Sequence, residues 1–554
     1  MRHHLYELND AGSLVRLRGD RYEFWIYRQL AKRLATGELA VDDSLRHRRF
    51  GDELVSPEKT AAILQTLTIP WVTNPAGARI DELCAALDQQ WKGFDQDLRD
   101  GRLTHIDFDP ERKSITWRRS KAEQADGIQD GIYDNLTAQP IVDVFRFVNQ
   151  ACGFLSALTP LQPRYAKKVA DEAELMAVIM ARAMGFGNFG MAQACDIPYH
   201  QLETTDRQHI RPATLHDSCD RISNFIAALP IFPLYTIDPE VLYGAVDGQK
   251  FAAAKPTIKA RYSSKYFGTG RGVVAYSLLA NHVPLETMLI GANEHESQYL
   301  FDICFRNSTQ IMPAVITGDM HSVNKANFAI LDWFGMQAAP RFTSLQAQIP
   351  HLFCADDISR YASFLLPPAG QIDRRLIAAE PDTFNRIVAT LALKETSQAA
   401  LVHKLCSLSS QNRSRKAVFE YDKLVRSIYT LQYIRSPKLQ RDVHRSQNRI
   451  EAYHQLRSTI AQIAGRKQLI GNSELDIFLT NQCGRLLALV IIAYNSILLS
   501  SVLDRHRAAG DEAAIARLQK ISPVAWQSIL FLGRYLFRGP RQPIDVNSLI
   551  TIPS

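Results

Sequence analysis

The spacing of apolar residues divides the chain into a helical first part and a mixed central part. In Tyr22–Leu34 and Glu172–Met184, apolar residues recur every three or four positions, as on one face of a helix. Most of residues 15–235 follow this pattern, and the basic run Ser114–Arg119 predicts a short strand among the helices. We therefore expect a mainly α-helical region before residue 240.

After Pro239 the pattern changes to short runs rich in apolar and β-branched residues, which is typical of strands. With the helix patterns between them, the runs give the order β-β-β-α-β-α-β. The first three suit an antiparallel meander, whereas the fourth needs a crossover helix. This order predicts an α/β fold with an RNase H-like mixed sheet. The expected strands are Leu242–Phe251, Gly272–Leu279, Leu285–Ile290, Ala314–Thr317 and Ala338–Phe342, with helices at Ser297–Phe305 and Lys325–Phe334.

Helical patterns return in residues 346–440, and a long helix, Val443–Ala464, follows them. Its apolar residues share one face, and Glu451 falls roughly opposite, free to point into a cleft or into water. Leu486–Leu503 carries no charge and reaches the lower edge of a membrane-spanning length, about 17–20 residues. A helix buried in a large core has the same pattern, and the polar Asn495 inside it favours that interpretation.

Composition narrows the possible functions only slightly. Hydrophobic residues are 46% and charged residues 22% of the 554, which indicates a globular protein and excludes wholesale disorder. The net charge of +7 permits binding to a polyanion without requiring it. The eight cysteines are scattered, without a CxxC pair, and the first residues lack the apolar stretch of a secretory signal. We expect free thiols and a cytoplasmic protein.

Three acidic residues stand at positions suited to a metal site. Asp247 ends the apolar part of the first strand, Asp319 lies just past the fourth, and Glu451 projects from the long helix. Adjacent strands can bring the two aspartates together, and a helix packed on the sheet can deliver the glutamate. Hard oxygen ligands of this kind suit a pair of Mg²⁺ ions. A single acidic residue at such a position is more often a turn cap or a solvated side chain than a metal ligand. Only the strand order, which brings the three acids together, favours a metal site.

Other motifs indicate chemistry less clearly. Gly185–Gly190 matches GxGxxG but follows a helix pattern, so it lacks the strand that a dinucleotide site requires. Gly268–Gly272 lacks the Lys-Ser/Thr ending of a phosphate-binding loop and reads as a turn. Glu294–Glu296 and His321 have no partner at the spacing of a helical metal pair. For these we expect ordinary hydrogen-bonded polar residues.

Six short stretches form a combination that is more specific than any one of them. They are Val246–Phe251, Arg261–Gly272, Thr317–Phe328, Phe334–Phe342, Tyr429–Ile434 and Gln447–Glu451, with further similarity in Leu175–Cys195 and Ile521–Tyr535. In this order and spacing, over about four fifths of the chain, they resemble the catalytic half of the replicative Tn3-type transposases. The resemblance implies that Asp247, Asp319 and Glu451 are the catalytic and metal-binding DDE triad of an RNase H-like core.

The sequence departs from the family pattern in several places. Gly244–Val246 stands where serines are usual, Thr317-Gly318 precedes Asp319 where Thr-Asp is common, and Ile450 replaces the usual glycine before Glu451. Members of the family typically also have an N-terminal half that recognises the transposon's terminal inverted repeats, and the resemblance does not include it. The alternatives are a fragment, a split gene product that works with a separate N-terminal polypeptide, or a decayed relative.

The resemblance implies an enzyme that cleaves transposon-end DNA and transfers the 3′-OH to target DNA in replicative transposition. Its implied cofactors are two Mg²⁺ ions, with Mn²⁺ as a substitute. Its implied partners are DNA, a second copy of the chain and a separate end-recognition polypeptide. Arg261, Lys265 and Arg271 are candidates for DNA phosphate contacts, although a solvated hairpin explains them equally well. The alternative function is a non-catalytic DNA-binding or dimerising remnant that regulates a full-length transposase.

The length and these patterns predict six segments, consistent with roughly three to five domains. They are a helical scaffold and DNA-contact region (1–130), a helical dimerisation or linker region (131–239), the first part of the RNase H-like core (240–345), a helical insertion (346–440), the last part of the core with Glu451 (441–505) and a helical tail (506–554).

Overall fold

The chain forms two compact units, each assembled from separate stretches of sequence. The computed structural model describes residues 2–9, 13–44, 47–73, 76–118, 132–134, 136–162, 171–539 and 543–546. The helical unit comprises Met1–Arg102, Asn324–Gly335 and Ala347–Leu431, and the sheet unit comprises Leu103–Val323, Met336–Gln346 and Gln432–Ser554. The six segments expected from the sequence stay a prediction.

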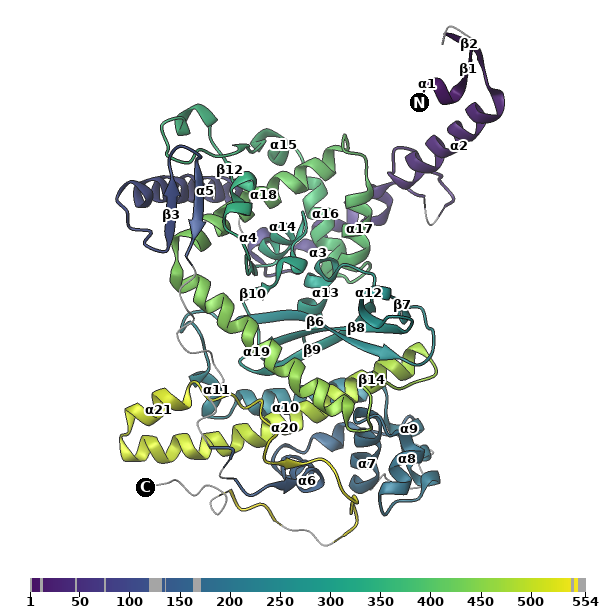
Figure 1. Ribbon diagram of the computed structural model, residues 1–554, viewed down its shortest axis with the longest axis vertical. Helices are drawn as coiled ribbons and strands as arrows, with labels where there is room; N and C mark the ends of the chain where they lie inside the picture. The colour runs from purple at the N-terminus through teal and green to yellow at the C-terminus, as the bar shows by residue number, and fades with distance from the viewer. Residues whose placement is uncertain are drawn as a thin grey trace. The chain divides into compact units, whose positions relative to one another are not determined.

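The sheet unit is built on a mixed sheet of seven strands with β6 in its middle (Figure 1). On one side β6 pairs with β10, which runs parallel to it and to β11. On the other side β8 runs antiparallel to β6 and to both β9 and β7, and β14 pairs with the end of β6. The strands are β6 (Tyr243–Ala253), β7 (Arg261–Tyr262), β8 (Arg271–Ala280), β9 (Val283–Gly291), β10 (Val315–Gly318), β11 (Gln337–Pro340) and β14 (Gln468–Leu469).

The five strands expected from the sequence are present, with ends within two residues of those predicted. The predicted meander is confirmed in β6, β8 and β9, and the fourth strand is parallel to the first, as a crossover connection requires. The expected helix Ser297–Phe305 is the 3-10 turn η4 (Glu296–Tyr299) followed by α13 (Leu300–Arg306). The apolar, β-branched runs and the helix patterns between them therefore sufficed to locate these elements.

The helix expected at Lys325–Phe334 is α14 (Asn327–Trp333), whose packing the sequence did not indicate. Although it connects β10 to β11, it belongs to the helical unit. Its Trp333 packs against Phe384 and Tyr421 of that unit, with ring centroids 5.2 and 5.5 Å away. An apolar helix face does not specify its partner, so sequence patterning could not reveal this placement.

Two long helices hold the sheet unit together. Helix α19 (Pro437–Gln462) packs across β6, β8 and β10, and α20 (Glu474–Ala509) packs against β9, α7 and α10 (Figure 1). By length and composition α20 could cross a membrane, but 89% of its apolar window is buried inside the protein. Asn495 within it donates from Nδ2 to the Pro523 and Ala525 carbonyl oxygens, both at 2.8 Å. The expected buried helix is confirmed.

Smaller elements complete the sheet unit. The basic strand expected at Ser114–Arg119 is present as β4, which pairs with β3, while Arg119 lies outside the described residues. The remaining elements are β3 (Ile106–Asp109), β4 (Ser114–Trp117), β5 (Gln139–Pro140), α6 (Ile141–Cys152), α7 (Glu172–Ala183), α8 (Gly187–Ala194), α9 (Tyr199–His209), α10 (Pro212–Ala227), α11 (Ile231–Leu234), α12 (Ser264–Phe267), α21 (Glu512–Leu518) and β15 (Ile529–Leu530).

The helical unit is organised around a cluster of aromatic rings that includes Trp71, Trp333 and Tyr421. Asp422 accepts hydrogen bonds from the backbone N–H groups of Phe328 and Ala329, so it caps α14 from another helix. The elements are α1 (Arg2–Leu5), β1 (Tyr6–Leu8), β2 (Leu14–Leu17), α2 (Gly19–Ala35), α3 (Pro57–Leu64), α4 (Pro70–Thr73), α5 (Ala76–Arg99), β12 (Phe353–Cys354), β13 (Gly370–Gln371), α15 (Arg374–Ala378), α16 (Pro381–Ala392), α17 (Gln398–Ser407) and α18 (Arg413–Arg435).

Candidate metal and catalytic site

Asp247 lies on the face of β6 that α19 covers. Side chains alternate between the two faces of a strand, so Asp247 and Gln249 point to the same side. The buried Gln249 donates from Nε2 to the His454 carbonyl oxygen and to Ser458 Oγ at 2.5 and 2.8 Å. These bonds fix the distance between strand and helix directly beside Asp247.

The Thr317 hydroxyl joins α19 to the sheet through hydrogen bonds. It donates to the Gly244 carbonyl oxygen of β6 at 3.1 Å and accepts from Gln447 Nε2 of α19 at 2.9 Å. Ser446 Oγ lies 3.0 Å from the same hydroxyl oxygen, and Thr317 is fully buried. One side chain on β10 therefore sets the position of α19 relative to two strands.

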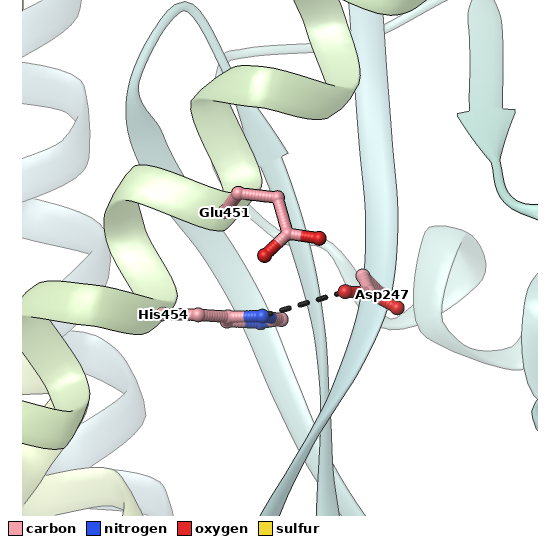
Figure 2. A group of neighbouring side chains, drawn as sticks. All are labelled: Asp247, Glu451 and His454. Atoms are coloured by element: carbon pink, nitrogen blue, oxygen red, sulfur yellow. Dashed lines mark ion pairs between the residues drawn. The ribbon is translucent and has the colours of Figure 1, made fainter.

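Asp247, Glu451 and His454 converge between β6 and α19 (Figure 2). One donor atom from each of the three lies within 4.8 Å of the others, and His454 Nδ1 is 3.4 Å from Asp247 Oδ2. Glu451 and His454 are three positions apart on α19 and so share a helix face. Glu451 is exposed, as its place opposite the apolar stripe predicted, whereas His454 is buried.

Asp319 does not belong to this three-residue group. The parallel pairing sets Val315 opposite Tyr243 and Thr317 opposite Ala245, a register that would continue to Asp319 opposite Asp247. However, β10 ends at Gly318, and the Asp319 carboxylate caps the turn η5 (Met320–Ser322) by accepting from the His321 N–H at 2.8 Å. The strand order thus brings Asp319 to the neighbourhood of Asp247, and local capping sets its side-chain direction.

A fourth acid, Glu296, approaches β6 from the opposite face. A Cβ atom at Gly248 would lie 2.3 Å from Glu296 Oε1, so only glycine leaves room for this carboxylate. Burial raises the pKa of Glu296 to about 7, and the charge of Asp247 adds to the effect while Lys250 opposes it. The sequence assigned Glu296 to ordinary polar residues because nothing in its spacing reveals that η4 packs beside Asp247.

Tyr276 adds a second polar group on the Glu296 side of the sheet. It lies opposite Gly248 in the β6–β8 pairing, and its hydroxyl is buried without a hydrogen-bond partner in the described part of the chain. Burial, and then the charges of Glu296, Asp247 and Asp319 among others, raise the pKa of Tyr276 well above its ordinary value. The phenol therefore stays protonated beside the acids.

The candidate phosphate-binding residues Arg261, Lys265 and Arg271 lie together on the segment between β6 and β8. Arg261 and Arg271 sit on the paired strands β7 and β8, Lys265 lies on α12, and all three are exposed. Among the described residues, none of them forms an ion pair with a carboxylate. Residues 254–272 also contain Lys255 and Lys259 but no acidic residue. The positive charge of this segment is therefore not neutralised locally.

The glycine motifs do not form nucleotide sites. Gly185 has a φ of 84° and lies in the turn between α7 and α8, and Gly187, with a φ of 66°, is the first residue of α8. Helix α7, and not a strand, precedes that turn, so the described residues here lack the geometry of a dinucleotide-binding loop. Gly268–Gly272 forms the connection from α12 into β8, in agreement with the turn expected there.

Comparison with known proteins gives the site a family context. The Tn3 transposase DDE domain matches residues 143–535, which is well over half of the chain. The transposase for transposon Tn501 of Pseudomonas aeruginosa is 22% identical over 529 residues, covering 95% of this chain and 53% of that protein. The transposase for transposon Tn1546 of Enterococcus faecium is 21% identical over 562 residues, covering 99% and 54%. The transposase for transposon Tn21 of Escherichia coli is 22% identical over 527 residues, covering 94% and 52%.

These relatives are longer than the chain. It spans about half the length of the curated relatives that it matches. The matched region contains β6, β10 and α19, and with them the three acidic residues singled out from the sequence.

Proposed function

The chain belongs to the Tn3 transposase family, and from that premise we propose that it cleaves transposon-end DNA and joins the freed 3′-OH to target DNA in replicative transposition. The observation that carries this proposal is the convergence of Asp247 and Glu451 from β6 and α19, beside the end of β10 where Asp319 lies. The order and directions of the strands support an RNase H-like core as the scaffold of the site.

The donor atoms fit divalent metal ions. Carboxylate oxygens of Asp247 and Glu451 lie close enough to share one cation, and Asp319 completes the set in this proposal. Two Mg²⁺ ions, or Mn²⁺ in their place, would activate the attacking oxygen and stabilise the charge on the leaving oxygen.

The chemistry is an in-line phosphoryl transfer in two steps. In the first step, water attacks the phosphorus at the transposon end, the bond to the 3′ oxygen breaks, and a 3′-OH is released. In the second step, that 3′-OH attacks a phosphodiester of the target DNA and displaces another 3′ oxygen. The three carboxylates would hold the cations that activate these oxygens. Because the nucleophile is water in the first step and the 3′-OH in the second, no covalent bond to the protein forms in either step.

The basic segment between β6 and β8 is suited to hold the DNA backbone. Arg261, Lys265 and Arg271 are exposed and not neutralised by ion pairs among the described residues, so their charge is available to phosphate. Lys250, three residues beyond Asp247 on β6, lies 4.4 Å from the Tyr266 ring centre, which places the segment beside this strand on the face that Glu296 approaches. We propose that these side chains position a phosphodiester near the metal ions.

Two further partners follow from the reaction. Both ends of a transposon must be joined, so a homodimer is the simplest functional assembly. The matched region is about half of each relative's length, and we propose that protein outside these 554 residues supplies recognition of the terminal inverted repeats. The site of action is the cytoplasm of a bacterial cell, at the DNA.

Cleavage of labelled transposon-end DNA with Mg²⁺ tests the proposal. We expect strand-specific nicks from the intact chain, supplied with an end-recognition polypeptide if needed, and loss of nicking in each of three neutral variants: Asp247→Asn, Asp319→Asn and Glu451→Gln. Asp504→Asn is the matched control, because Asp504 is an exposed acid on α20 outside the site.

The outcomes separate the two functions. Normal activity in any one of the three variants removes that residue from the catalytic set. DNA binding without nicks by the intact chain, under all these conditions, supports the alternative of a non-catalytic remnant that regulates a full-length transposase.

A further inference from the structure

His454 is the buried member of the three-residue group at the site. Its side chain is only 9% exposed, compared with 21% for Asp247, and Nδ1 points toward the Asp247 carboxylate (Figure 2). Glu451 and His454 are three positions apart on α19 and lie on one face. A Glu-x-x-His pair on a helix is an arrangement by which helical proteins present a carboxylate and an imidazole to a metal ion.

The contacts of the imidazole do not amount to a complete hydrogen-bond network. His454 Nδ1 is 3.4 Å from Asp247 Oδ2, which is longer than the 2.9–3.0 Å usual for an N–H···O bond. Nε2 is buried and has no hydrogen-bond partner in the described part of the protein. The nitrogen that faces the Asp247 carboxylate is Nδ1, so Nδ1 is the ring atom placed to bind a cation together with the two carboxylates. The backbone of α19 is held against β6 at this residue, because the His454 carbonyl oxygen accepts from Gln249 Nε2.

We propose that His454 supplies a nitrogen ligand, through Nδ1, to a divalent cation held by Asp247 and Glu451. The inference deepens the proposed function, since it concerns the same metal site. It replaces an all-oxygen donor set by a mixed oxygen and nitrogen set. With Nδ1 bound to the metal, the proton of the neutral imidazole resides on Nε2.

The donor set has a consequence for metal preference. Imidazole suits Mn²⁺ and other first-row transition metals better than it suits Mg²⁺, which prefers oxygen ligands and retains its waters. An acid-only site discriminates less between the two ions. We therefore expect the protein to bind Mn²⁺ more tightly than Mg²⁺, and we expect that preference to depend on His454.

Pulsed electron paramagnetic resonance of Mn²⁺ bound to the whole chain, without DNA, tests the proposal. Protein labelled with ¹⁵N only in histidine should show nitrogen modulation of the Mn²⁺ signal at the ¹⁵N frequency, and His454→Gln should lose it. His200→Gln is the matched control, because His200 is an exposed histidine of α9, and it should retain the modulation. In parallel, His454→Gln should weaken Mn²⁺ binding by at least about 10- to 100-fold, because that loss is already seen when residues that only support the metal ligands are removed.

The spectrum of the labelled wild-type protein tests the role of His454 even if a variant fails to fold. One outcome is that Mn²⁺ binds stoichiometrically to the wild-type protein, does not bind to Asp247→Asn, and shows no ¹⁵N modulation. This result overturns the role of His454 and leaves the carboxylate site of the proposed function intact. Absence of Mn²⁺ binding at millimolar concentration overturns both. Nicking of DNA is not read in this experiment, so failure of the transposase proposal alone does not change its result.

Discussion

The Thr317 hydroxyl gives the sharpest test of how the fold positions Glu451. Replacing it by valine, Thr317→Val, keeps the volume of the side chain but removes the hydroxyl. Gln447 Nε2 and Ser446 Oγ then lose their partner in a fully buried place, since their residues are 6% and 3% exposed. The substitution therefore removes polar contacts between β10, β6 and α19 with little change in packing.

The expected loss of stability follows from the polar groups that stay buried without a hydrogen-bond partner. A buried donor without a partner costs about 1–3 kcal/mol, and the Gln447 amide is one such group after the substitution. With the weaker contribution of Ser446, we expect Thr317→Val to lower the local stability of α19 by about 2–3 kcal/mol. Thr317→Ser keeps the hydroxyl and loses one methyl group, which costs about 1 kcal/mol. The polar contacts thus predict that valine is the more damaging replacement.

Native-state hydrogen exchange of β10 and α19 is the appropriate assay, because a chain of two compact units need not unfold in one step. A loss of 2 kcal/mol corresponds to roughly 30-fold faster exchange of the amides of α19 under conditions where exchange reports stability. The Thr317→Val protein should also bind Mn²⁺ more weakly, since Glu451 and His454 move with the helix. If Thr317→Ser proves as damaging as Thr317→Val, packing rather than the hydroxyl fixes α19, and the reasoning above is wrong.

Three further outcomes are expected. Mg²⁺ and Mn²⁺ should both support nicking. Ca²⁺, which is larger and less strict in geometry, should allow the protein to assemble on DNA but should support little cleavage. Nicking that survives EDTA would exclude a metal-dependent mechanism. In a salt titration, the chain alone should bind a terminal-repeat duplex and a scrambled duplex about equally, with a Kd of roughly 10⁻⁴–10⁻⁶ M at physiological salt. Alanine at Arg261, Lys265 and Arg271 should make the dependence of log Kd on log salt concentration shallower. A preference of about 10³-fold or more for the terminal-repeat duplex would show that the chain itself recognises the DNA sequence. Asn495→Leu should destabilise the sheet unit by about 1–3 kcal/mol, because two buried carbonyl oxygens lose their donor, and an unchanged midpoint in urea unfolding shows that these bonds contribute nothing net.

The sequence by itself determined the order of elements and singled out the three acids of the proposed site. Short runs of apolar and β-branched residues located β6, β8 and β9, and a period near 3.6 located α19, because strands buried on both faces are apolar throughout whereas a helix buried on one face is apolar at that period. The same periodicity placed Glu451 away from the buried stripe, and the structure has it exposed. The separation between Asp247 and Asp319 matches the offset of the parallel register, so strand order alone brought them to the same edge.

Tertiary structure decided what surrounds those acids. His454 lies on α19 among many polar residues, and only the packing of that helix against β6 shows that its imidazole is buried beside Asp247. Glu296 reaches Gly248 from the opposite face of the sheet through contacts that no local spacing encodes. Helix α14 belongs to the helical unit although it connects two strands of the sheet unit. The physical reason is the same in each case: periodicity records that a face is buried, whereas the partner that buries it is set by long-range packing and by which polar groups can be satisfied there.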